Sequence, residues 1–190
     1  MEYGTAVHVA AFAVIGYIAT IFYLIAEGIA GGMQPPISYY YGAKLFDKIS
    51  QTVLLAVKVV ILLAIGMVVS LNLFPEAIIG IFIDDNPQLM IEALKGVRLH
   101  LFALAFDGII FIATMYFIAM NQAETSLKIS IANMAIQLPF IFCLPPLFGI
   151  TGVWLSVPIS NIVLTVLLLP LFIKELNSFK QQSGQQNQNV

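Results

Sequence analysis

The sequence predicts an all-α membrane protein with five transmembrane helices, and two observations lead to this expectation. First, 60% of its 190 residues are hydrophobic and only 9% are charged, whereas an ordinary soluble domain is about 25% charged. Second, five segments each approach the ~20 apolar residues that a helix needs to cross a bilayer. A soluble fold would need a polar shell that this composition does not provide, so we expect lipid around the chain.

The first three expected spans contain few charged side chains and cover about residues 5–31, 53–74 and 97–120. The fourth and fifth share residues 129–173, a stretch without any charged residue that is about twice as long as one span requires. Prolines and glycines near its middle predict a break. We therefore expect two spans joined by a short loop at residues 145–151, with bounds of about 129–147 and 151–173.

The connections differ in character. Residues 31–36 read Gly-Gly-Met-Gln-Pro-Pro, and the two missing backbone donors and two flexible glycines are unsuitable for a plain helix interior. Residues 73–94 predict a short interfacial helix and then an exposed turn around Asp84 and Asp85. Residues 177–190 have almost no apolar surface to bury. We expect them to form a disordered polar tail after a transmembrane domain of residues 1–176.

Composition also excludes several classes of function. The net charge is −2 and no basic stripe is present, so nucleic acid is not an expected partner. The single Cys143 excludes a disulfide framework or a cysteine-based metal site within one chain. His8 and His100 lack a second metal ligand at a characteristic spacing. With no phosphate-binding glycine loop or nucleophile elbow either, we expect no enzyme activity, no metal site and no cofactor.

The distribution of basic residues predicts an orientation in the membrane. One side of the expected topology carries only Lys95 and Arg98. The other side carries five basic residues: Lys44, Lys48, Lys128, Lys174 and Lys180. Because basic residues accumulate in cytoplasmic loops, we expect the C-terminus in the cytoplasm of a cell (inner) membrane and the N-terminus outside. An outside N-terminus without a signal segment would be natural if a preceding helix had been lost.

A motif in residues 28–43 resembles the loop-bearing helix in the C-terminal half of multidrug and toxic-compound extrusion (MATE) transporters. The matching residues are Gly28, Gly32, Gln34, Pro35, Ile37, Ser38, Tyr39, Tyr41, Gly42 and Ala43. Pro36 departs from the motif at a variable position. Residues 82–86, Gln122-Ala123, and residues 148–154 with Pro158 are also similar to the family. The resemblance covers about residues 5–175 and implies helices eight to twelve of a twelve-helix fold, an incomplete six-helix half.

The resemblance implies a cation-coupled antiporter, driven by protons or sodium, that exports drugs and organic cations. Because the drug cavity of the family lies between two halves, we expect the chain to need the missing N-terminal half or a second chain as a partner. Two alternatives remain open. One is a flippase of the same superfamily that moves lipid-linked substrates, and the other is a truncated fragment or membrane scaffold without transport activity.

Asp107 is the first candidate for the coupling site. It lies about ten residues inside the third expected span, roughly 15 Å deep at 1.5 Å per residue. An ionisable group at that depth is costly and usually faces a cavity or a partner. Several MATE members place a cation-coupling aspartate on the corresponding helix, which implies the same role here. The alternative is an interhelical hydrogen-bonding residue without a transport role.

Glu27 and Lys58 are the next candidates. They lie on consecutive antiparallel spans, at similar distances along the chain from Lys44. Since either charge alone would be strongly penalised in the membrane, we expect the two to form an ion pair. The pair is either purely structural, or it is broken during transport when Glu27 binds a proton or cation.

Two further sets of residues are candidates for movement and for cavity lining. The expected hinge or cavity-mouth residues are Gln34, Pro35, Pro36, Pro139 and Pro158, because prolines kink membrane helices. Helix packing alone explains such prolines equally well. The expected cavity lining is polar or aromatic and consists of Asn133, Gln137, Tyr23, Phe106 and Phe111. Hydrogen bonding between helices, core packing or lipid contact would explain these residues without a cavity.

Overall fold

The computed structural model describes residues 4–83 and 86–188, with side chains described up to residue 178. In this part of the chain every regular element is a helix. The elements, in chain order, are α1 (Ala6–Gly32), α2 (Gln34–Gly42), α3 (Phe46–Leu73), α4 (Pro75–Ile79), α5 (Pro87–His100), the 3₁₀ turn η1 (Leu101–Ala103), α6 (Leu104–Ala119), α7 (Ala123–Phe148) and α8 (Ile150–Gln188).

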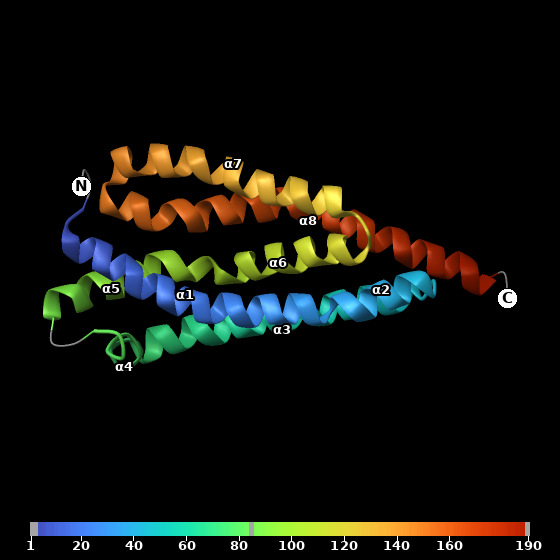
Figure 1. Cartoon of the computed structure of the whole chain (residues 1–190), viewed down its shortest axis with the longest axis horizontal. Helices are drawn as coiled ribbons and strands as arrows, with labels where there is room; N and C mark the ends of the chain where they lie inside the picture. Colours follow the sequence, from blue (N-terminus) through green and yellow to red (C-terminus); the bar gives the residue numbers. More distant parts are fainter. Residues whose placement is uncertain (1–3, 84–85, 189–190) are drawn as a thin grey trace.

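Five membrane-spanning segments confirm the predicted fold class. They are long and apolar enough to cross a bilayer and comprise α1 with α2 (Ala6–Gly42), α3, α5 with α6 (Pro87–Ala119), α7, and α8 up to Ser178. The spans run up and down in one elongated bundle, with the N-terminus and the α7–α8 turn at one end (Figure 1). The α2–α3 and α6–α7 turns lie at the other end, from which α8 extends beyond the bundle.

The first span is interrupted less than the sequence suggests. Irregular backbone was expected over residues 31–36, but α1 and α2 are separated only by Met33, whose φ of −79° and ψ of −14° stay in the right-handed region. Pro35 and Pro36 lie in the first turn of α2. The first backbone N–H groups of a helix have no acceptor within that helix, so a proline in the first turn costs no hydrogen bond. The two prolines therefore begin the new helix rather than a loop.

The third span begins at Pro87, ahead of the predicted start near residue 97, and it is bent in the middle. Asn86 caps α5 by accepting a hydrogen bond from the Leu89 backbone at 3.0 Å. After α5 the chain tightens into the 3₁₀ turn η1 and then continues as α6. Asp107 lies in the first turn of α6, directly after this change of helix type. The interruption therefore positions the carboxyl group inside the bundle.

The chain reverses within the predicted residues 145–151, but the connection is a single residue rather than a loop. Helix α7 continues through Pro145 and Pro146 to Phe148, and only Gly149 separates it from α8. Proline φ is itself compatible with a helix, so these prolines do not end α7. The reversal depends on Gly149, whose φ of 60° and ψ of −135° are essentially restricted to glycine. The predicted short helix after residue 73 is present as α4; Asp84 and Asp85 lie outside the described residues.

Helix α8 continues to Gln188, through most of the residues 177–190 that were expected to form a polar tail; disorder of that tail stays a prediction. Extending an existing helix adds one hydrogen bond for each residue fixed, whereas starting a helix is costly. Glutamine and lysine are good helix formers, so a polar extension of a stable apolar span remains helical.

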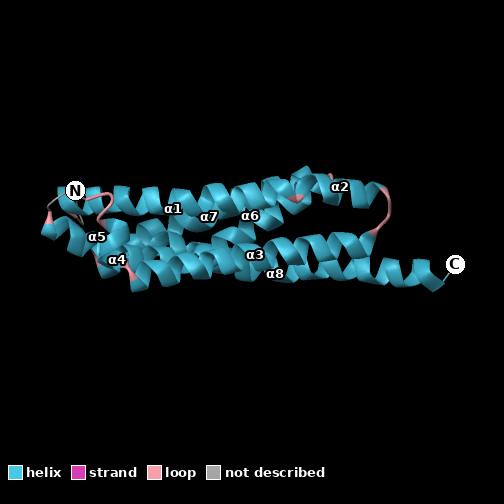
Figure 2. Ribbon diagram, turned by 90° about the horizontal axis from the view of Figure 1, so that it is seen from below, coloured by secondary structure: helices cyan, strands magenta, loops and turns pink. Residues whose placement is uncertain are grey.

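The five spans contribute unequally to the core. In the span formed by α5 and α6, 50% of the apolar window is buried, compared with 6% for α7. Helix α6 contacts α1, α3, α7 and α8, whereas α7 packs mainly along α8. Figure 2 shows the same bundle from a second direction, again with α8 extending past its neighbours. The centre of the core is therefore the span that carries Asp107.

Candidate functional site

A cavity of about 170 Å³ lies where α1, α6, α7 and α8 meet. Its lining consists of Tyr23, Asp107, Ile110, Phe111, Asn133, Gln137, Val157 and Asn161. Most of its polar side chains are amides, and the only charged one is Asp107. The cavity thus combines one carboxylate with several neutral oxygen atoms in the middle of the bundle.

Two side chains from neighbouring helices hold the Asp107 carboxylate. The Tyr23 hydroxyl of α1 donates a hydrogen bond to Oδ2 at 3.1 Å. The Asn161 amide of α8 donates to Oδ1. Both carboxylate oxygens therefore accept a hydrogen bond, as suits an ionised carboxylate, which has acceptors only. Through these two contacts Asp107 links α1 and α8 to α6.

Two amide oxygens in the cavity have no partner among the described residues. Asn133 Oδ1 on α7 and Asn161 Oδ1 on α8 are both buried and accept no hydrogen bond. Leaving a buried acceptor unsatisfied costs about 1–3 kcal/mol, so such groups in a native protein require an explanation such as a bound ion or water. Hard cations prefer carboxylate and carbonyl oxygen ligands. Asp107, Asn133 and Asn161 thus bring oxygen atoms of the kind that hard cations prefer into one cavity.

The sequence identified most of this lining. Tyr23, Asp107, Phe111, Asn133 and Gln137 come from three different spans and line one cavity. The rings of Tyr23 and Phe111 meet edge to face at 5.7 Å between centroids.

Two features of the site were not foreseen. Phe106 is outside the lining, and its backbone carbonyl accepts a hydrogen bond from Thr165 at 3.4 Å. Asn161 was missed, although it is a polar residue in a span without charges. The rule that singled out Asn133 and Gln137, namely polar side chains within an apolar helix, would also have found it.

The predicted ion pair between Glu27 and Lys58 is absent from the ion pairs of the described residues, and both side chains are exposed. In α1 the buried positions next to Glu27 are Ala26 and Ala30, and Glu27 lies at the edge of that buried face with its side chain exposed. In α3 the buried residues Val53, Ala56 and Val60 likewise turn Lys58 outward. Counting along the chain gives the depth of a residue but not the face on which it lies.

The expected hinge residues fall outside the cavity lining. Gln34, Pro35 and Pro36 form the first turn of α2. Pro139 lies inside α7 and Pro158 inside α8, where each removes one backbone donor from a continuous helix. Pro158 follows Val157, which lines the cavity. A hinge function of these residues stays a prediction.

Together, the five apolar spans and the carboxylate held between them define a multi-pass α-helical membrane protein. The chain belongs to the MatE family, whose family model matches residues 1–143. A similar curated protein is the multidrug export protein MepA of Staphylococcus haemolyticus, 27% identical over 146 residues, which are 77% of this chain. The chain spans 32% of the length of that protein.

Solved structures of MATE transporters share the fold. An outward-facing conformation of a multidrug resistance MATE family transporter superposes with a TM-score of 0.86 at 18% identity, covering 95% of this chain and 41% of the other. An inward-facing conformation gives 0.79 at 18% identity, covering 91% and 40%. A transporter of the wider superfamily from Pyrococcus furiosus gives 0.80 at 20% identity, covering 90% and 39%. The chain therefore corresponds to about two fifths of such a transporter.

Proposed function

We propose that this chain is part of a cation-coupled exporter of drugs and organic cations, in which the cavity around Asp107 binds the coupling ion. The observation that carries the proposal is the combination of one partly buried carboxylate with two amide oxygens that have no partner among the described residues, all in one cavity. Membership of the MatE family and similarity to a multidrug export protein support the class of substrate.

The oxygen atoms favour sodium over a proton as the ion bound in this cavity. A proton on Asp107 would neutralise the carboxylate but leave the oxygens of Asn133 and Asn161 without partners. A sodium ion would take oxygen ligands from all three side chains, as hard cations do. Asp107 would supply the charge, and the two asparagines would select for an ion that has lost part of its hydration shell.

Ion binding would act on helix packing through the contacts of Asp107. Without an ion, the carboxylate accepts hydrogen bonds from Tyr23 on α1 and Asn161 on α8. A bound cation competes with both donors for the same oxygens and so weakens the links of α6 to α1 and α8. An ion shifts a conformational equilibrium by its difference in affinity for the two states. Occupation of the cavity would thereby favour one of the two openings of the transporter.

The substrate pathway requires a second half. The exposed Glu27 on α1 is costly in lipid, which supports its facing a water-filled space between two halves. We propose that a six-helix half, in the same or another chain, covers this surface. In the assembled protein the C-terminus would lie in the cytoplasm, as the distribution of basic residues indicates.

The cavity itself favours cations over lipid-linked anions. A flippase for anionic lipid carriers would present basic side chains to its substrate, whereas the lining around Asp107 contains neither lysine nor arginine. If Asp107 had only a structural role through its hydrogen bonds, replacing it would leave export unchanged.

Efflux from cells tests the proposal. Cells that produce the assembled transporter are loaded with a fluorescent lipophilic cation, and the wild type is compared with Asp107→Asn. Asp47→Asn, at an exposed aspartate in the first turn of α3, is the matched control. We expect efflux to be lost in Asp107→Asn and retained in Asp47→Asn, at equal amounts of protein in the membrane. Full efflux by Asp107→Asn would refute the proposed role of the cavity.

A further inference from the structure

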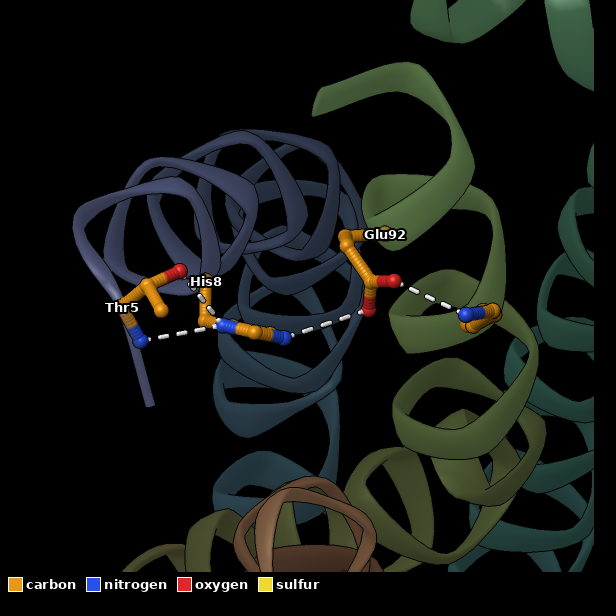
Figure 3. Close-up of polar contacts among 4 residues, drawn as sticks. Thr5, His8 and Glu92 are labelled. Carbon is orange, nitrogen blue, oxygen red and sulfur yellow. Dashed lines mark hydrogen bonds and ion pairs between the residues drawn. The ribbon is translucent and has the colours of Figure 1, made fainter. Parts of the chain in front are cut away.

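A polar cluster joins the start of α1 to α5, at the end of the bundle opposite the α6–α7 turn. Figure 3 shows its members: Thr5, His8 and Glu92 are labelled, and Lys95 completes the chain of contacts. His8 Nε2 lies 3.4 Å from Glu92 Oε2, and Lys95 Nζ lies 2.8 Å from Glu92 Oε1. On the other side of its ring, His8 Nδ1 lies 3.0 Å from the Thr5 backbone nitrogen. His8 is thus the central residue of the cluster.

The contacts of His8 determine where its proton lies. A backbone N–H can only donate, so the bond from Thr5 N–H requires an unprotonated Nδ1. The single proton of a neutral imidazole is then on Nε2, from which it points to the Glu92 carboxylate. In this state His8 caps the start of α1 through Nδ1 and links α1 to α5 through Nε2. Both contacts are satisfied only by neutral His8 in this tautomer.

Protonation of His8 would change the two contacts in opposite directions. The added proton is on Nδ1, so the Thr5 N–H loses its acceptor and the capping of α1 by His8 is broken. At the same time Nε2–H belongs to a cation, and its contact with Glu92 becomes an ion pair. The Thr5 hydroxyl, 2.9 Å from Nδ1, can turn from donor to acceptor, but the backbone amide cannot.

Among the described residues, the charged side chains that face His8 come from α5. From α5, Glu92 and Lys95 face it, while the exposed Arg98 belongs to no ion pair of the described residues. His100 is held elsewhere, with Nδ1 2.9 Å from the Trp154 carbonyl oxygen. From α8 the neighbours are apolar, because Ile150, Val153 and Trp154 line a 340 Å³ cavity together with His8.

We propose that His8 is a proton-responsive contact: when it is protonated, the cap of α1 at Thr5 opens and the link from α1 to Glu92 of α5 becomes an ion pair. The same two spans meet again at the bond from Tyr23 on α1 to Asp107 on α6, which continues α5. Protonation at one end of these spans would therefore act on helices that also form the cavity. This consequence for transport rests on the proposed function, whereas the change at Thr5 does not.

The test is made on the full transporter that contains this chain, with isotope-labelled histidine and backbone, in lipid nanodiscs. At about pH 8, above the histidine range, nitrogen NMR of His8 should show a bare Nδ1 and a protonated Nε2. The pH is then lowered until the same spectra show a proton on both nitrogens. The hydrogen-exchange protection of the Thr5 amide, corrected for the intrinsic rate, should fall about tenfold, as loss of one hydrogen bond predicts.

Two variants separate His8 from other titrating groups. Glutamine can occupy the third position of a capping box, so His8→Gln should keep the Thr5 amide protected equally at both pH values. His100→Gln removes the other histidine of the chain and should leave the pH effect intact. A proton on Nδ1 of wild-type His8 at pH 8, or equal Thr5 protection at both pH values, would overturn the proposal even if a variant fails to fold. Persistence of the pH effect in His8→Gln would overturn it as well.

A separate readout addresses the consequence for transport. If the His8 contact acts on the cavity, His8→Gln should flatten the pH profile of efflux but leave efflux itself intact. Loss of efflux in Asp107→Asn with an unchanged NMR response of His8 would separate the two proposals. An unchanged pH profile in His8→Gln, together with the expected NMR response, would confine His8 to a local role and contradict its effect on the cavity.

Discussion

Asn161 does two things that one side chain of another type could not do. Its amide nitrogen donates to the Asp107 carboxylate, while its amide oxygen remains buried and unpartnered in the cavity. A second carboxylate at this position would repel Asp107, and a hydroxyl group is too short to present a donor and an acceptor so far apart. The amide is thus suited to a site that is either empty, with Asp107 held by donors, or occupied by a cation.

The first prediction concerns this residue. Replacing Asn161 with alanine removes one oxygen ligand of the proposed sodium site and one donor to Asp107. An interaction with a charged group contributes about 1.5–3 kcal/mol, so we expect the sodium concentration for half-maximal thermal stabilisation to rise at least about tenfold. The matched control is Asn72→Ala, at an exposed asparagine of α3 whose side chain, among the described residues, donates a hydrogen bond to the Val68 carbonyl of its own helix. Equal sodium dependence in the two variants would contradict the role of Asn161.

At the scale of elements, the crossing of α6 over α3 depends on the absence of a side chain next to Asp107. A Cβ atom added at Gly108 would lie 2.0 Å from Val60 Cγ1, much closer than any real contact. Valine is stiff at χ1, so Val60 cannot easily turn away. Gly108 thus allows the close approach of the two helices that encloses the neighbouring carboxylate.

Replacing Gly108 tests that crossing. We expect Gly108→Ala to lower the free energy of unfolding by about 1–3 kcal/mol, the usual cost of overpacking, and the double variant with Val60→Ala to recover most of the loss. Thermal unfolding of the purified protein measures both. Gly66→Ala on α3, where an added Cβ meets nothing within 4 Å, should have little effect. If Gly108→Ala were as stable as Gly66→Ala, α6 and α3 would not be in the close contact at Gly108 that the structure shows.

The number of membrane spans could be predicted from the sequence, but the buried face of each helix could not. Bilayer thickness sets the length of an apolar span, so all five spans were predicted from composition. Which face of each helix is buried could not be predicted in the same way, because it depends on which neighbouring helices pack against it. Glu27 and Lys58 were therefore paired on depth alone and proved to lie on outward faces.

The connection between α7 and α8 differs from the prediction for a local reason. A loop was expected over residues 145–151 because of the prolines, whereas the chain reverses at Gly149 alone, which has a positive φ. At the site, Asp107, Asn133 and Gln137 were found because each is polar within an apolar span. Their convergence on one cavity, and the contribution of Asn161, required the packing of four helices.

At the scale of the whole molecule, much apolar surface remains to be covered by lipid or by a partner half. Beyond the exposed Glu124 and Lys128 near its start, the outer side of α7 is apolar, with exposed residues such as Ile131, Met134 and Leu138. The outer side of α1 is different, because it carries Glu27 next to Gly28. This contrast supports lipid outside α7 and an aqueous space outside α1.

Cysteine labelling distinguishes the two surfaces. The exposed Cys143 is first replaced with alanine, and single cysteines are then introduced at Glu27 and at Met134. In the assembled transporter we expect Glu27→Cys to react with a charged, water-soluble maleimide and Met134→Cys to remain unlabelled, because thiols in lipid are neither ionised nor reached by the reagent. Labelling at Met134 with protection at Glu27 would reverse the assignment of the surfaces.

The central claim is that ion binding at Asp107 drives export. It is tested most directly in proteoliposomes that contain the complete transporter, with an imposed sodium gradient and a fluorescent lipophilic cation as substrate. We predict that the substrate moves against the direction of sodium flux in the wild type, and that Asp107→Asn abolishes both movements while Asp47→Asn abolishes neither. Sodium-driven substrate transport that survives in Asp107→Asn would contradict the account.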